Sequence, residues 1–175
     1  RRVFRDIPGL PAPSWGHRLE IALSPDGARA ACFAPPRFTL EGSSGFVLNV
    51  VDLESGKVTK PIEPIGFSCP PLGSAVGSPP LMWLDVRTIL CQVDRRLVTI
   101  DVTNGAKEDI VDLPGERNRE APHVVLSLED GVARAALSAW RDKPWGGRYR
   151  VDLARKKLIE EDDMLGGRYS LRTAK

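Results

Sequence analysis

One short motif occurs three times along the chain at nearly constant spacing. Val51-Asp52-Leu53 recurs as Ile100-Asp101-Val102 and again as Val151-Asp152-Leu153, so the aspartates lie 49 and then 51 residues apart. Before each aspartate, apolar residues occupy alternate positions, which is the pattern of a half-buried β-strand. Repetition at such a period indicates an architecture built from one supersecondary unit, and it constrains the fold more than any other feature of the sequence.

Turn residues follow each aspartate, and another short strand-like stretch follows each turn. The first two turns contain Gly56 and Gly105, whereas the third copy has no glycine. We therefore predict that Asp52, Asp101 and Asp152 begin the turns of β-hairpins and do not form an acid/base pair. A second strand-turn-strand element precedes each hairpin, so each unit contains about four short strands.

The domain organisation follows from these units and from the distribution of glycine and proline. With 16 Gly and 15 Pro throughout the 175 residues, and with no long apolar run at helical spacing, we expect many short antiparallel strands. We predict an extended N-terminal arm over 1–16 and a single β domain over 17–175. The three repeat units are expected at 17–64, 79–116 and 121–163, with a Pro/Gly-rich crossover at 65–78.

The first unit carries a recognisable turn sequence. Leu23-Ser24-Pro25-Asp26-Gly27 runs into Ala28-Arg29-Ala30-Ala31, and it resembles the Ser-Pro-Asp-Gly signature of TolB-like and WD40-like β-propeller repeats. Val51 to Lys57 resembles the second hairpin of the same repeat, and the resemblance extends over about three repeats, from His17 to Asp163. The resemblance implies a β-propeller, a fold whose members bind many unrelated partners.

Three units are fewer than the four to eight blades of a typical propeller. We therefore predict a partial or incomplete propeller, with self-association through open blade edges or completion by further sequence or a partner. The exposed apolar surface is expected near Phe46, Leu48 and Val50 of the first unit, or near Tyr169 and Leu171 at the end of the chain.

Catalytic motifs are absent from the sequence. It contains no Gly-x-Ser-x-Gly elbow, no His-Glu-x-x-His and no phosphate-binding glycine loop, so we expect a non-catalytic chain without cofactor or metal. His17 and His123 precede the first strand of units one and three, where we expect a structural role, with a shared metal ion as the alternative. Cys32 and Cys91 lie in apolar runs, as small core residues do.

The candidate binding site is an aromatic and basic segment of the third unit. It comprises Trp140, Arg141, Lys143, Trp145, Arg148 and Tyr149. Trp, Tyr and Arg are the residue types that anchor protein interfaces. The alternative interpretation is structural, with Trp140 packing between units and Trp145 covering the loop. The run Glu160-Glu161-Asp162-Asp163 is interpreted as a solvated hairpin end, because consecutive strand residues point to opposite faces.

These observations favour a protein- or peptide-binding scaffold of β-propeller type, within a larger chain or complex. The alternative is the propeller domain of a serine-peptidase-like hydrolase whose catalytic domain lies outside this chain, and a third hypothesis is a ligand-binding β domain that uses Trp140 and Trp145. The net charge of only +2 argues against a nucleic-acid partner, and no apolar run is long enough to span a membrane. For the compartment we favour the cytoplasm, with the periplasm or secretion as alternatives if Arg1 follows a removed signal.

Overall fold

A computed structural model of the chain describes residues 21–34, 38–39, 42–43, 46–58, 62–65, 80–114, 123–138 and 147–161. All regular structure in these ranges is β-strand, and neighbouring strands in every sheet run antiparallel. The prediction of an all-β, antiparallel fold is therefore confirmed. Within these same ranges there is no helix of the length and apolarity that a membrane span requires.

Three four-stranded sheets make up most of the structure, and in each the strands lie side by side in chain order. Along the chain, the connection from the second to the third strand of the first sheet contains a separate two-stranded ribbon of β3 (Phe38–Thr39) and β4 (Gly42–Ser43). The first sheet contains β1 (Ile21–Leu23), β2 (Arg29–Ala34), β5 (Phe46–Asp52) and β6 (Ile62–Ile65). The second contains β7 (Leu81–Trp83), β8 (Thr88–Val93), β9 (Arg96–Asp101) and β10 (Lys107–Asp112). The third contains β11 (His123–Glu129), β12 (Val132–Ser138), β13 (Gly147–Asp152) and β14 (Lys157–Glu161).

The turn between β1 and β2 is held by its own side chains. Asp26 Oδ1 accepts hydrogen bonds from the Ser24 hydroxyl at 2.6 Å and from the Ala28 N–H at 3.1 Å, and Gly27 takes the left-handed φ of +69° that this turn requires. The Ser24 hydroxyl, which is buried, also accepts from the Arg29 N–H at 2.9 Å. The bond from Ser24, more than any other interaction, lowers the pKa of Asp26 below its usual value.

The second sheet forms the corresponding turn without a Pro-Asp-Gly sequence. Asp85 Oδ1 accepts from the backbone N–H groups of Arg87 at 2.7 Å and Thr88 at 2.8 Å. One aspartate therefore supplies the local hydrogen bonding that Ser24 and Asp26 share in the first sheet.

The three repeated aspartates each fold a hairpin turn, as predicted. Asp52 Oδ1 accepts from the N–H and the hydroxyl of Ser55, at 2.8 and 2.7 Å. Asp101 Oδ1 accepts from both groups of Thr103, at 2.8 and 2.5 Å. Asp152 Oδ1 accepts from the Arg155 N–H at 2.9 Å. These bonds explain why the same short motif recurs at each of the three hairpins.

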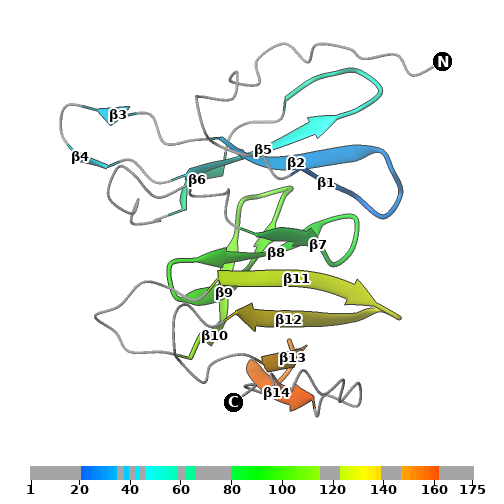
Figure 1. The fold of residues 1–175 in the computed structure, drawn as a ribbon. Helices are drawn as coiled ribbons and strands as arrows, with labels where there is room; N and C mark the ends of the chain where they lie inside the picture. Colours follow the sequence, from blue (N-terminus) through cyan, green and yellow to red (C-terminus); the bar gives the residue numbers. More distant parts are fainter. Residues whose placement is uncertain are drawn as a thin grey trace, which may run out of the picture.

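The three sheets stack face to face, from top to bottom in Figure 1. A first inter-sheet cluster joins the first and second sheets, and its buried members are Ala31, Phe33, Leu48, Val50, Leu81, Trp83, Ile89, Cys91, Val98 and Ile100. A second inter-sheet cluster joins the second and third sheets, and its buried members are Met82, Leu90, Leu97, Ile110, Leu113, Val124, Ala133, Ala135, Leu137 and Val151.

The central position of the second sheet follows from its sequence. Leu81-Met82-Trp83 and Ile89-Leu90-Cys91 are continuous apolar runs, and alternate residues of each run enter the two different clusters. A strand that is buried on both faces needs such a run, whereas a strand with one solvent-exposed face alternates between apolar and polar residues. Strand β7 lies against both β1 and β11, so the first strands of the three sheets adjoin, and the Trp83 indole N–H donates to the Ala22 carbonyl at 3.0 Å. Open sheets stacked in this way fit a blade-like arrangement.

Cys32 and Cys91 are buried free thiols, as the sequence predicted. Burial raises the pKa of the Cys91 thiol to about 12, which leaves it protonated and inert at neutral pH. The third cysteine, Cys69, lies outside the described residues, and so do the arm 1–16, His17, and all of the crossover except Ile65 at the end of β6.

The predicted position of exposed apolar surface on the first unit was wrong. Leu48 and Val50 are 0% and 1% exposed, because they are on the face of β5 that packs against the second sheet. The most exposed large apolar residues in the described parts of the outer sheets are instead Ile21 at 61%, Leu23 at 62% and Val125 at 55%. Alternation along a strand shows which residues share a face, but it does not show which face meets another sheet. The side chain of Phe46, and Tyr169 and Leu171, are outside the described part of the chain.

Candidate binding face on the third sheet

Four of the six predicted site residues, Trp140, Arg141, Lys143 and Trp145, lie outside the described residues, in the connection between β12 and β13. The other two, Arg148 and Tyr149, are on β13. As consecutive strand residues they point to opposite faces of the third sheet. Tyr149 packs against the second inter-sheet cluster, whereas Arg148 faces away from the second sheet. The structure therefore does not bring Arg148 and Tyr149 together on one face.

Tyr149 is packed locally as well. Its ring lies over Gly147, where a side chain would begin only 2.9 Å from the ring carbon Cε2. Glycine at this position leaves room for the tyrosine to lie along its own strand. This packing accounts for Tyr149 within the fold of the third sheet.

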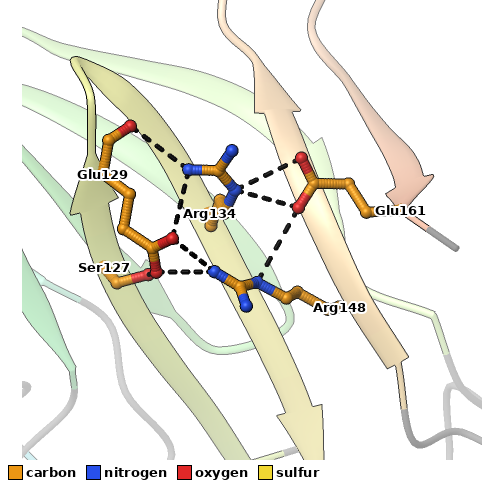
Figure 2. Close-up of polar contacts among 5 residues, drawn as sticks. All are labelled: Ser127, Glu129, Arg134, Arg148 and Glu161. Carbon is orange, nitrogen blue, oxygen red and sulfur yellow. Dashed lines mark hydrogen bonds and ion pairs between the residues drawn. The ribbon is translucent and has the colours of Figure 1, made fainter. Parts of the chain in front are cut away.

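Arg148 belongs to a network on the outward face of the third sheet, the face turned away from the second sheet (Figure 2). Its guanidinium Nη2 is 2.6 Å from Glu129 Oε1, and its Nε is 3.7 Å from Glu161 Oε2. Arg134 Nε donates to both oxygens of Glu161, at 2.9 and 3.2 Å. These four residues, Arg134, Arg148, Glu129 and Glu161, are called the Arg–Glu network below.

Two further contacts fix the position of Glu129. The Ser127 hydroxyl donates to Glu129 Oε1 at 3.1 Å, and Arg134 Nη1 donates to the Glu129 backbone carbonyl at 3.2 Å. Figure 2 shows the two guanidinium groups between the carboxylate of Glu129 on one side and that of Glu161 on the other. Each acid thus contacts both arginines, and all four strands of the third sheet contribute to the arrangement.

The Arg–Glu network is partly open to water. The side chains of Arg134, Glu161, Arg148 and Glu129 are 20%, 28%, 39% and 47% exposed. Single exposed ion pairs contribute roughly 0–1 kcal/mol, but a network of several fixed charges contributes more than isolated pairs. The two positive and two negative groups of the network compensate one another. Arg150, which is paired with Arg134, and Val125 are exposed on the same face. Its chemistry is that of a fixed hydrogen-bonding surface.

Three members of the network, Glu129, Arg134 and Glu161, were absent from the predicted site. Glu161 was interpreted as part of a solvated hairpin end, yet it is half-buried between two arginines, while its neighbour Glu160 is exposed. The available signal was period-2 alternation, which places Arg134, Arg148 and Glu161 on the face opposite to Ala135, Tyr149 and Leu158. That signal became informative only with the strand register, which pairs Arg148 with Glu161.

A second polar surface lies beside β9 and β10, where Arg96, Asp109, Asp112 and Lys156 line an open depression. Arg96 hydrogen bonds to Asp109 and lies 3.4 Å from Asp112, and Lys156 lies 2.8 Å from Glu108. These charges compensate one another and form no single-sign site. Among the residues that the structure describes, no group of three or more His, Cys, Asp or Glu side chains could hold a metal ion.

Comparisons with known proteins identify no family for this chain. No family model matches it, and no curated protein matches it. Among solved structures, a Clostridium novyi NT protein described as a conserved lipoprotein matches with a TM-score of 0.46 and 8% sequence identity. The match covers 86% of this chain and 89% of that one.

Proposed function

We propose that this chain is a protein- or peptide-binding scaffold module of β-propeller type, and that its sheets are part of a larger ring of blades. The observation that supports this most directly is the stacking of three four-stranded meanders through two continuous apolar clusters, with their first strands adjoining. Blades of a propeller are packed in this manner around a central axis.

The number of sheets supports the second part of the proposal. Three blades span only part of a ring that takes four to eight, so further sheets come from additional sequence or from an associated polypeptide. Most of the outward face of the first sheet is already buried, at Ala30, Cys32, Asn49 and Val51. Beside them, Ile21 and Leu23 of β1 are exposed where a preceding blade would cover them. Burying a side chain of this kind stabilises an assembly by about 1.5–3 kcal/mol, which gives association a driving force.

The test is the mass of the purified chain in solution, measured by sedimentation equilibrium over a wide concentration range. We expect association that depends on concentration, followed by a structure of the associated species in which another sheet covers the first one. A compact monomer of 19.2 kDa at every concentration, with a single cooperative unfolding transition, would contradict the proposal. The three sheets would then form a self-contained stack.

A further inference from the structure

The strand registers allow residues of the three sheets to be matched position by position. Leu48 in β5 is paired with Ile62 in the outermost strand, and Leu97 in β9 is paired with Val111. Arg148 in β13 is paired in the same way with Glu161. Leu48, Leu97 and Arg148 therefore occupy equivalent positions, and Ile62, Val111 and Glu161 occupy the equivalent positions next to them.

A third set of equivalent residues lies on the second strand of each sheet. The neighbours of Leu48, Leu97 and Arg148 on that strand are Phe33, Gln92 and Ala136. Two residues earlier on the same strands, and therefore on the same faces, are Ala31, Leu90 and Arg134.

In the first two sheets these positions form the apolar contact with the next sheet. Leu48 and Ala31 are fully buried in the first inter-sheet cluster, and Leu97 and Leu90 are fully buried in the second. Ile62 and Val111 pack against the same clusters. In the third sheet the same three positions carry Arg148, Arg134 and Glu161, and the Arg–Glu network replaces the apolar contact.

A further apolar sheet on this face would have to remove water from two arginines and two glutamates. Desolvation costs several kcal/mol per ion, and the ion pairs already present gain little that is new when covered. The same positions in the other sheets gain free energy by burial, since leucine and isoleucine contribute about 1.5–3 kcal/mol each. Covering these positions with an apolar sheet is therefore favourable at the first two sheets and unfavourable at the third.

At the opposite end of the stack, the first strand of the first sheet carries apolar residues on its outward face. Ile21 is paired with Cys32 and Leu23 with Ala30, as Leu81 is paired with Cys91 and Trp83 with Ile89. Leu81 and Trp83 are buried against the first sheet, whereas the equivalent Ile21 and Leu23 are mostly exposed. On β2 and β5, however, the residues of this outward face are already buried: Ala30, Cys32, Asn49 and Val51 are 7%, 4%, 5% and 1% exposed. Only the β1 side of the face is therefore open.

From these matches we infer that the third sheet is the last of its stack, because the Arg–Glu network closes that end to a further apolar sheet. This closure rests only on the residues of the third sheet, so it does not depend on the proposed function.

The experiment replaces the network with the residues of the second sheet, in the triple variant Arg134→Leu, Arg148→Leu and Glu161→Val. We expect this variant to associate more strongly than the wild type at the same concentration, seen as a higher mean mass in sedimentation. The matched control is Arg96→Leu with Asp109→Val, which removes an exposed ion pair of the second sheet outside the inter-sheet positions. The control is expected to keep the mass of the wild type.

Two further variants separate this inference from the proposed function. Leu23→Lys places a charge on the outward face of the first sheet, and it is expected to abolish association of the wild type but not the added association of the triple variant. Val125→Lys, which adds a charge to the outward face of the third sheet outside the network, is expected to leave wild-type association unchanged. If the wild type is monomeric, the proposed function fails while the triple variant still tests the closed end.

The inference would be overturned by a triple variant that is folded by circular dichroism yet has the mass of the wild type. It would also be overturned if Val125→Lys disrupted wild-type association, because the third sheet would then already be a contact surface. If the triple variant does not fold, the double variant Arg148→Leu with Glu161→Val keeps the Arg134–Glu129 pair and tests the same expectation.

Discussion

At the scale of single residues, the three hairpins that follow the repeated aspartates share one backbone position with positive φ. Gly56 and Gly105 occupy it at +70° and +74°, and Lys156 occupies it at +52°. A residue with a Cβ pays a conformational cost of about 1–2 kcal/mol in this region, which glycine avoids. The third hairpin tolerates the cost, and Lys156 forms an ion pair with Glu108 of the second sheet at 2.8 Å.

A pair of substitutions tests this difference. Gly56→Ala is expected to lower the free energy of unfolding by about 1 kcal/mol, through backbone strain, since no atom beyond this residue and its two chain neighbours lies within 4 Å of the added Cβ. Lys156→Gly relieves the strain and loses one exposed ion pair, so we expect stability to stay within about 1 kcal/mol of the wild type. Urea denaturation measures both. A loss in Lys156→Gly as large as that in Gly56→Ala would contradict this account.

The turn aspartates also predict how stability depends on pH. Hydrogen bonds from Ser24, Ser55 and Thr103 lower the pKa values of Asp26, Asp52 and Asp101, respectively, below their usual value. For a carboxyl whose pKa is lower in the folded state, the stabilisation is present above the unfolded pKa of about 3.9 and is lost as pH falls through the folded pKa.

We therefore expect the free energy of unfolding to fall as pH drops below about 4. The triple variant Asp26→Asn, Asp52→Asn and Asp101→Asn should show a shallower fall over the same range, because asparagine does not titrate. Urea titrations at a series of acidic pH values compare the two proteins. If the free energy of unfolding fell equally steeply with pH in both proteins, other carboxyl groups would account for the loss of stability in acid.

At the scale of elements, the contact between sheets depends on Trp83. This side chain is 3% exposed within the first inter-sheet cluster, and its indole N–H donates to the Ala22 carbonyl of β1. It is thus both an apolar member of the second sheet and a hydrogen-bond donor to the first. Phenylalanine at this position would keep most of the apolar volume but would lack the N–H donor.

Trp83→Phe is expected to destabilise the protein by about 1–3 kcal/mol, since it leaves the Ala22 carbonyl without this partner. Trp83→Ala should cost about 3–5 kcal/mol, because a cavity is added to the lost hydrogen bond. Chemical denaturation followed by circular dichroism ranks the variants independently of tryptophan fluorescence. Equal losses in both variants would mean that the hydrogen bond, and not the packing, accounts for the whole effect.

Much of this element-level structure was accessible from the sequence, and the reasons are local. The hairpins at Asp52, Asp101 and Asp152 are determined by side-chain hydrogen bonds to residues two or three positions away, so their sequence motif suffices. The burial of Leu48 was predicted incorrectly because it depends on the second sheet, which no local pattern of β5 specifies. The Arg–Glu network was missed for the same reason, since its members come from four strands.

At the scale of the whole molecule, the second sheet contributes to both apolar clusters. Ile89 belongs to the first cluster and its neighbour Leu90 to the second, and both are fully buried. The two clusters are therefore connected through one set of strands, and loss of either removes support from the same sheet. This predicts that the three sheets unfold together.

Ile89→Ala and Leu90→Ala provide the test. Each is expected to cost about 2–5 kcal/mol and to retain one transition, with circular dichroism and tryptophan fluorescence coinciding. A biphasic transition in either variant would show that the first and third sheets unfold independently. As a control, Val86→Ala, at a 40% exposed position in a turn, is expected to change stability by no more than about 0.5 kcal/mol.

The chain-order arrangement of the strands also has a kinetic consequence. Every described ladder joins strands separated by one connection, except that β2 and β5 flank the small β3–β4 ribbon. Contact order within each sheet is therefore low, and closing such short loops costs little entropy. The sequence-distant contacts, such as that of Trp83 with Ala22, join different sheets. During synthesis from the N-terminus, the three sheets therefore emerge from the ribosome in the same order in which they are stacked.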